Sequence, residues 1–273
     1  MSNEHNTPPV CMTIAGLDPS GGAGIIADIK TFFAHGCFPT AAVASITFQN
    51  TIAVFGAVSQ TAETVRQQVQ PVIDDMGLSA LKTGMLPTRE VIVETARLIE
   101  SNCISNVVVD PVVRSTSGFD LIDDSALRSS IEHLFPLASV LTPNIPEVER
   151  ISGVAIENVD DVLSAAEVIM GFGVKCLLIK GGHLSSLGTG KRMAVDHLFI
   201  DGEHLTFEDP YIETTATHGT GCTLAAAIAA NLALGKDLKE SIRQAKTFVN
   251  RAIATAPDLG RGNSPINVQP ILR

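Results

Sequence analysis

The chain has no tryptophan, a single tyrosine and few charged residues for a length of 273 residues. Aromatic residues make up 4% of it and charged residues 18%, whereas hydrophobic residues make up 45%. Disordered chains are richer in charge and poorer in apolar residues, so this composition excludes a disordered or repeat protein. It indicates a compact, enzyme-like α/β protein with a substantial buried core.

Cysteine is also sparse, and positive charge is in deficit. The five cysteines are odd in number and widely spaced, without a Cys-x-x-Cys pair, so we expect neither a disulfide framework nor a zinc site, and a reducing cytosol fits best. The formal net charge is −10, which argues against non-specific binding to nucleic acid or to an anionic membrane.

Targeting and membrane segments are not apparent. Residues 1–9 have no basic region followed by an apolar core, so we expect no signal peptide. The longest apolar helical pattern, residues 224–234, is too short to span a bilayer, which needs about 20 residues. We therefore expect a soluble, cytoplasmic protein.

Short β-type runs alternate with helical patterns along almost the whole chain. This alternation predicts a mostly parallel sheet with helices on both faces. No long linker interrupts it, so we expect one domain over residues 1–273, with residues 1–9 as a flexible tail. The predicted strands are 10–15, 40–47, 80–83, 106–110, 138–141 and 176–180, with a hairpin over 194–199 and 205–207. The predicted helices are 23–35, 62–76, 88–101, 159–172, 223–234 and 238–256.

Polar and glycine-rich residues gather directly after the predicted strands. In open α/β sheets, ligands bind at the carboxyl ends of the strands, so we expect these clusters to share one crevice. The clusters are 16–24, 49–50, 82–85, 110–118, 144–147 and 181–183.

Residues 217–223 form the strongest candidate for a ligand-binding loop. They read Thr-His-Gly-Thr-Gly-Cys-Thr and lead straight into a run of helix formers. The unpaired N–H groups at a helix start, with the positive end of the helix dipole, favour a phosphate or another oxyanion. Cys222 lies at the tip, where a helix N-terminus is expected to lower a thiol pKa. Base, nucleophile and inert buried filler stay open as roles for Cys222.

The glycine-rich turn 16–24 does not have the pattern of a dinucleotide site. Gly22, Gly24 and Ala27 fit the spacing G-x-G-x-x-A, but no acidic residue follows about 20 positions later to bind a ribose. A Walker A sequence is absent from the chain as well. The turn contains Asp18 and Ser20 among four glycines, so we expect it to approach a ligand closely; a purely structural tight turn is the alternative.

Two carboxylates and a lysine follow predicted strands and suit phosphate chemistry. Asp110 and Glu147, with Asn144 between them, supply the oxygen ligands that Mg²⁺ prefers. The alternative is structural: Asp110 would cap a turn, and Glu147 would complement the dipole in the first turn of a helix. Lys180 ends a strand beside two glycines, where it could hold a transferring phosphate or simply face solvent.

Two further polar residues have a weaker signal. The Gln49 amide has both a donor and an acceptor for the edge of a heterocycle, but an ordinary loop glutamine would look the same. His183 is a candidate base, and a surface loop position is the more common reading for such a histidine.

Taken together, these motifs resemble those of the bacterial hydroxymethylpyrimidine/phosphomethylpyrimidine kinases of thiamine biosynthesis, which belong to the ribokinase-like superfamily. The resembling segments occur in order and cover nearly the whole chain. They are 13–16, 18–24, 27–31, 49–51, 82–85, 109–112, 142–144, 146–147, 180–183 and 217–223.

The resemblance implies a ribokinase-like three-layer sandwich and an ATP- and Mg²⁺-dependent enzyme. It would phosphorylate 4-amino-5-hydroxymethyl-2-methylpyrimidine and then the monophosphate to the pyrophosphate. Cys222 would accept the hydroxyl proton, and Lys180 would steady the phosphates. The family commonly dimerises, so the resemblance also implies a homodimer. The remaining implied roles are the anion hole (Gly219, Thr220, Gly221), the Mg²⁺ ligands, direct or through water (Asp110, Asn144, Glu147), and the pyrimidine pocket (Gln49, Ala23, Asp28, Met85, Gly16).

Some positions depart from the family pattern and bear on substrate choice. Leu17 stands where Thr or Ser is usual, Phe48 where a smaller residue is common, and Thr116 where a lysine often precedes the Ser-Gly pair. These positions concern the pocket and the flap, and leave open whether both phosphorylations occur. A pyridoxal kinase and a non-catalytic pyrimidine sensor are the alternative functions. The segments 115–119 and 185–190 are candidate lids.

Overall fold

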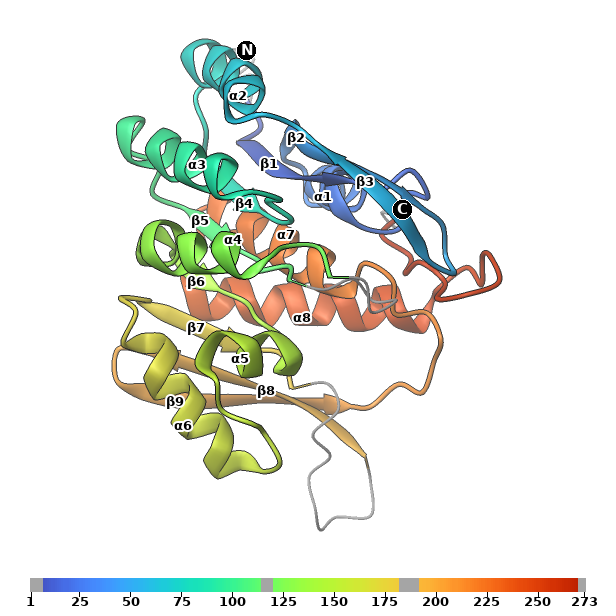
Figure 1. The fold of residues 1–273 in the computed structure, drawn as a ribbon. Helices are drawn as coiled ribbons and strands as arrows, with labels where there is room; N and C mark the ends of the chain where they lie inside the picture. The colour runs from blue at the N-terminus through green and yellow to red at the C-terminus, as the bar shows by residue number, and fades with distance from the viewer. Residues whose placement is uncertain (1–6, 114–119, 182–191, 270–273) are drawn as a thin grey trace, which may run out of the picture.

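The computed structural model describes residues 7–113, 120–181 and 192–269 (Figure 1). These residues form a nine-stranded sheet in the order β3-β2-β1-β4-β5-β6-β7-β8-β9. The strands are β1 Val10–Leu17, β2 Phe38–Gln49, β3 Val54–Ser59, β4 Ala80–Thr83, β5 Val107–Val109, β6 Val140–Leu141, β7 Cys176–Ile179, β8 Met193–Ile200 and β9 Glu203–Pro210.

The centre of the sheet is parallel and its two margins are antiparallel. Strands β2, β1, β4, β5, β6 and β7 pair in parallel, whereas β3 at one edge and β8 and β9 at the other pair antiparallel. The expected mostly parallel sheet is therefore confirmed. Parallel pairing also brings the carboxyl ends of six strands to the same edge.

Helices cover both faces of the sheet, which gives three layers (Figure 1). The central strands β5, β6 and β7 are short and apolar, as expected for strands buried on both faces. In β5, Val107 and Val109 join the core on one face, and Val108 joins the core on the other. The helices of the first face are α2 Ala62–Met76, α3 Arg89–Ser101, α4 Asp124–Ser129, α5 Ile145–Ser152 and α6 Val159–Met170; those of the second are α1 Gly24–Ala34, α7 Thr220–Ala233 and α8 Leu238–Ala254.

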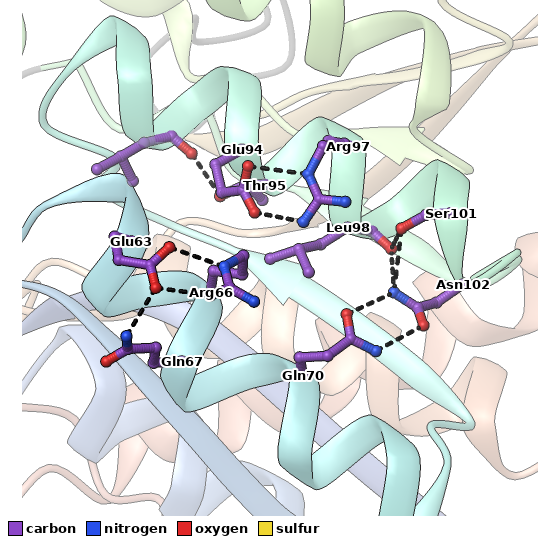
Figure 2. Close-up of polar contacts among 11 residues, drawn as sticks. Glu63, Arg66, Gln67, Gln70, Glu94, Thr95, Arg97, Leu98, Ser101 and Asn102 are labelled. Carbon is purple, nitrogen blue, oxygen red and sulfur yellow. Dashed lines mark hydrogen bonds and ion pairs between the residues drawn. The ribbon is translucent and has the colours of Figure 1, made fainter.

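On the solvent side, helices α2 and α3 are held together by polar contacts as well as by packing (Figure 2). The Gln70 amide donates to the Asn102 side-chain oxygen at 3.1 Å, and the Asn102 amide donates back at 3.4 Å. Arg66 pairs with Glu63 on α2, three residues apart. Exposed pairs of this kind are weak because water screens them, so the apolar face of each helix provides most of its stability.

The sequence predicts most of these elements and misses some. Helix 62–76 and strand 80–83 are confirmed to the residue, but β3 and α4 were not predicted. Helix α7 begins at Thr220 instead of 223, so Cys222 lies within its first turn. The last residue of the predicted tail contacts the sheet, since the backbone oxygen of Pro9 accepts a hydrogen bond from Phe38 N at 2.9 Å; a flexible tail stays a prediction.

Several predicted features lie outside the described residues. They are the candidate lids 115–119 and 185–190, His183, Thr116 and residues 1–6 of the tail. Within the described residues, no helix is both long enough and apolar enough to cross a membrane. The assignment of residues 1–273 to one domain stays a prediction.

Candidate active site

A cavity of about 160 Å³ opens at the carboxyl ends of the parallel strands. The predicted crevice is therefore present, because the end of β2 and the turns that follow β1, β4, β5, β6 and β7 all contribute to its wall. Of the predicted site residues, all but Asp28 line it: Gly16, Ala23, Gln49, Met85, Asp110, Asn144, Glu147, Lys180, Gly219, Thr220, Gly221 and Cys222.

The start of α7 has the geometry of an anion-binding loop. Gly219 is the N-cap residue, with φ +81°, and a Cβ there would lie 1.8 Å from the backbone oxygen of Gly22. Thr223 N donates to Gly219 O at 2.9 Å, which is the first bond of the helix. Among the described residues, none accepts a hydrogen bond from the backbone N–H of Gly221 or Cys222. These two donors are left for a ligand.

Cys222 lies in this wall with its thiol in a desolvated position. The pKa of the thiol is raised to about 11, chiefly by burial; the Lys82 ammonium opposes this rise, and the Asp110 and Asp28 carboxylates add to it. The Gly24 N–H also donates to the sulfur. The expectation that the helix start lowers this pKa is therefore wrong for the ligand-free protein, because desolvation of the thiolate outweighs the charges that favour it.

Lys180 is tied to Asp110 inside the cavity. The Lys180 ammonium donates to Asp110 Oδ1 at 2.8 Å, and Thr142 Oγ1 donates to the same oxygen at 3.3 Å. Burial opposes protonation of the lysine, but the Asp110 and Glu147 carboxylates hold its pKa above the ordinary value. A Cβ on Gly221 would lie 3.1 Å from Lys180 Nζ, so the glycine lets the cation approach the anion loop.

Asn144 and Glu147 cap α5 and also line the cavity, and Glu147 lies in the first turn of this helix, as the structural alternative predicted. Asn144 Oδ1 accepts from Glu147 N at 2.9 Å, and Glu147 Oε2 accepts from Asn144 N at 2.8 Å. This is a reciprocal capping box. Burial raises the pKa of Glu147 to about 7, against the opposing charge of Lys180. A buried carboxyl with a pKa near 7 would readily lose its proton when a cation binds beside it.

The oxygen donors fit a magnesium ion that keeps water and phosphate among its ligands. A Cβ on Gly221 would lie 3.9 Å from Asp110 Oδ2, so the second oxygen of this carboxylate lies toward the anion loop. Within the described ranges no group of three or more His, Cys, Asp or Glu side chains is arranged as a metal cluster. Two carboxylates beside a phosphate site are nevertheless a usual arrangement for Mg²⁺.

Asp28 is placed beneath the cavity and not in its wall. It is fully buried on α1, where its Oδ2 accepts from Thr13 Oγ1 at 2.6 Å and from Lys82 Nζ at 2.9 Å. Lys82 itself lines the cavity and is fully buried. The sequence places Lys82 in a polar cluster after a strand, but nothing in its local pattern predicts a partner 54 residues away.

Sequence reasoning also missed the pair formed by Asp18 and His218. His218 Nε2 lies 2.7 Å from Asp18 Oδ2, and both residues line the cavity. Burial opposes ionisation of Asp18, but hydrogen bonds from His218, Gln49 and Ser20 hold the pKa of its carboxyl below the usual range. The Asp-x-Ser spacing was a local signal for the bonds to Ser20, whereas the contact with His218 depends on the tertiary fold.

A mostly parallel sheet covered on both faces, with an anion loop, lysines and carboxylates around one cavity, defines a phosphotransferase of the ribokinase-like class. The phosphomethylpyrimidine kinase family profile matches residues 18–267. A hydroxymethylpyrimidine/phosphomethylpyrimidine kinase from Streptomyces coelicolor is 41% identical over 261 residues, covering 96% of this chain and 94% of that protein. The chain therefore belongs to the phosphomethylpyrimidine kinase family.

Solved structures agree with this assignment. The phosphomethylpyrimidine kinase of Clostridium difficile 630 superposes with a TM-score of 0.77 at 38% identity, covering 90% of this chain and 99% of that one. The pyridoxal kinase of Staphylococcus aureus in complex with AMP-PCP and pyridoxal gives a TM-score of 0.87 at 29% identity, covering 97% and 95%. The expected ribokinase-like architecture is confirmed.

Proposed function

We propose that the protein transfers the γ-phosphoryl group of ATP to 4-amino-5-hydroxymethyl-2-methylpyrimidine, and then a second one to the resulting monophosphate. The observation that carries this proposal is the meeting of Cys222, the anion loop, Lys180 and two carboxylates in one cavity. Family membership supports the pyrimidine substrate, and the AMP-PCP complex of the S. aureus neighbour supports ATP as the donor.

In the first transfer, Cys222 acts as the base in its thiolate form. The substrate hydroxyl gives its proton to the sulfur while its oxygen bonds to the γ-phosphorus. The bond from this phosphorus to the bridging oxygen breaks, and ADP leaves with the electron pair. The free N–H groups of Gly221 and Cys222 and the Lys180 ammonium stabilise the charge on the transferring group. The thiol afterwards returns its proton to water.

Magnesium belongs to the proposal as the partner of the ATP phosphates. When bound, it would neutralise phosphate charge and align the γ-phosphoryl group. Asp110 and Glu147 would hold it directly or through water, with the Asn144 oxygen close by. Because Asp110 also accepts a hydrogen bond from Lys180, this carboxylate would be shared between the ammonium and the ion.

Recognition of the pyrimidine is assigned to the part of the cavity wall formed by the loops after β1 and β4 and by the end of β2. Gln49 provides a polar edge that matches an aminopyrimidine, while Met85, Gly16 and Ala23 provide an apolar surface for the ring. A Cβ on Gly16 would lie 3.1 Å from the Met85 sulfur, so the glycine leaves the pocket open.

Pyridoxal is the second candidate substrate, because of the structural likeness to the S. aureus pyridoxal kinase. The deciding experiment compares kcat/KM for the hydroxymethylpyrimidine, its monophosphate and pyridoxal, with ADP release as the readout. We expect the pyrimidine to be preferred at least tenfold. Pyrimidine binding without ADP release would leave only the sensor alternative.

We also propose a cytoplasmic homodimer. Apolar side chains on the β2–β3 ribbon support a partner surface, since Phe48, Phe55 and Val58 are more than half exposed. Light scattering of the purified protein tests the assembly, and Phe55→Ser together with Val58→Ser should shift it toward the monomer. A parent protein that is already monomeric would contradict this part of the proposal.

A further inference from the structure

Lys82 is a cation in the cavity wall with no role in the transfer described above. It lies on β4, is fully buried and lines the cavity. Its ammonium has three N–H donors. Within the described part of the chain, the one hydrogen bond that it makes is to Asp28, at 2.9 Å. Two donors are therefore not committed to the protein interior.

The surroundings keep Lys82 positively charged. Burial opposes protonation, but the Asp28, Cys222 and Asp110 side chains raise the pKa of the ammonium above its ordinary value. Thr13 Oγ1 donates to Asp28 at 2.6 Å and fixes the carboxylate. The second oxygen of Asp28 has no hydrogen-bond partner among the described residues, so the carboxylate interacts mainly with the lysine.

The neighbouring backbone makes room for this charge. A Cβ on Gly84 would lie 2.9 Å from Lys82 Nζ and 3.0 Å from the Ala15 Cβ. A side chain at this position would push the ammonium or Ala15 aside. A buried lysine and aspartate are costly compared with apolar side chains of similar volume, so a pair placed at the wall of the cavity needs an explanation beyond stability.

Cys222 lies in the wall of the same cavity as Lys82, on a helix that packs against β4. The charged groups that act on the thiol are Lys82, Asp110 and Asp28, and Lys180 is influenced by it as well. Both aspartates oppose a thiolate. Lys82 is the strongest of the groups that favour one, ahead of the hydrogen bond from Gly24 N–H.

We propose that Lys82 is a positioning residue for the cysteine base: its ammonium, held by Asp28, stabilises the Cys222 thiolate that receives the hydroxyl proton. This inference rests on the proposed kinase function for its consequence in catalysis. The effect of the Lys82 charge on the ionisation of Cys222 does not rest on that function, since a thiolate can be measured without ATP or pyrimidine. Asp28 does not line the cavity, and its role is to hold Lys82 in position.

The test measures alkylation of Cys222 by iodoacetamide at pH 8.5 in a Cys103→Ser background. Cys103 is the exposed cysteine, and Cys11, Cys37 and Cys176 are buried, so the rate reports Cys222. In Lys82→Met we expect the rate constant to fall at least threefold. A pKa rise of one unit reduces the thiolate fraction about tenfold. A more basic thiolate is also a stronger nucleophile, so the alkylation rate falls by less than the thiolate fraction does.

A matched control removes another buried lysine. Lys246 on α8 pairs with Asp196 at 2.6 Å and does not line the cavity. Lys246→Met should leave the alkylation rate within twofold of the parent. An unchanged rate in a folded Lys82→Met protein overturns the proposal, whether or not the protein is a kinase.

If Lys82→Met does not fold, a second variant tests the same proposal. Lys82→Met with Asp28→Asn removes both charges and leaves no buried ion unpaired. Because Lys82 acts on the thiol more strongly than Asp28, the rate should still fall below that of the parent, and an equal or higher rate overturns the proposal. In the kinase assay, kcat should fall at least tenfold with KM for ATP little changed; a change confined to KM would contradict the assigned role.

Discussion

The His218 imidazole and the Asp18 carboxylate are separated by 200 residues in sequence and by 2.7 Å in the fold. The pair joins the loop after β1 to the anion loop at the start of α7. Backbone contacts reinforce it, since a Cβ on Gly22 would lie 2.3 Å from His218 Cδ2 and one on Gly219 would lie 1.8 Å from Gly22 O. The loop after β1 and the loop at the start of α7 are thus one interlocked unit.

Asp18→Asn tests this connection through stability. We expect the variant to unfold more easily than the parent at pH 7, by about 1–3 kcal/mol, because buried donors lose their charged acceptor. The folded protein depresses the pKa of Asp18 below 3.8. The stabilisation that the ionised Asp18 carboxylate provides is therefore present above about pH 3.8 and is lost as the pH falls below it. Urea unfolding of both proteins from pH 7 to 2.5 should show the difference shrinking below about 3.8; a constant difference would argue against the ionic contribution.

The sequence predicted the strands and helices that have strong local patterns. Residues 106–110 contain three consecutive valines, which become the buried strand β5, and the glycine-rich loop before the apolar run becomes the start of α7. The parallel sheet then follows from alternation alone, and it brings the residues after each strand to one edge. This is why the sequence predicts the position of most of the candidate site.

The features that the sequence did not predict depend on distant partners. Strand β3 is largely exposed and has only a weak pattern, so its pairing with β2 decides its structure. Asp28 was assigned to the pocket, but its contact with Lys82 holds it beneath the wall. The pKa of Cys222 depends on how deeply the fold buries the thiol, which the helix-start pattern does not indicate.

Gly219→Ala should disrupt the anion loop. Gly219 has φ +81° and no space for a Cβ, so the loop must move away from Gly22. We expect kcat to fall by at least about a hundredfold, as is usual when oxyanion donors are displaced. Gly235→Ala is the matched control, because Gly235 has φ +79° but nothing within 4 Å of a Cβ. It should lose about 1 kcal/mol of stability and keep its activity. Equal losses of activity in both variants would contradict the loop assignment.

Glu147→Gln should make stability less dependent on pH and on magnesium. Burial raises the pKa of Glu147 from 4.5 to about 7, so the folded state favours the protonated carboxyl. This contribution is fully present below about pH 4.5 and is lost as the pH rises through 7. Glutamine keeps the capping box without ionising. We expect the melting temperature of the parent to fall relative to the variant between pH 5 and 8.

Magnesium provides the second readout for the same pair of proteins. At pH 8 a cation that binds Glu147 stabilises the folded parent by mass action. Millimolar Mg²⁺ should therefore raise the parent melting temperature more than that of Glu147→Gln. An equal rise in both would place the ion elsewhere.

Lys180→Met should reduce phosphoryl transfer and stability together. The variant removes a charge next to the transferring group and leaves the buried Asp110 without its cation partner. We expect kcat to fall about a hundredfold or more and the protein to lose several kcal/mol. Mg²⁺ should restore part of the stability by binding Asp110. Wild-type kcat in this variant would remove Lys180 from the mechanism.

Cys222→Ala separates a kinase from a pyrimidine sensor. Loss of a general base typically lowers kcat by about 10²- to 10⁴-fold, whereas binding of the pyrimidine, measured by calorimetry, should change little. A sensor would bind normally and show no turnover to lose. The pH profile gives an independent check, because the thiol of the free protein has a pKa of about 11. The thiolate fraction, and with it kcat/KM, should therefore rise about tenfold per pH unit between pH 7.5 and 9, where the carboxyl of Glu147 is already largely ionised. The residual activity of Cys222→Ala should lack this slope, and a parent profile that is flat over the same interval would exclude Cys222 as the base.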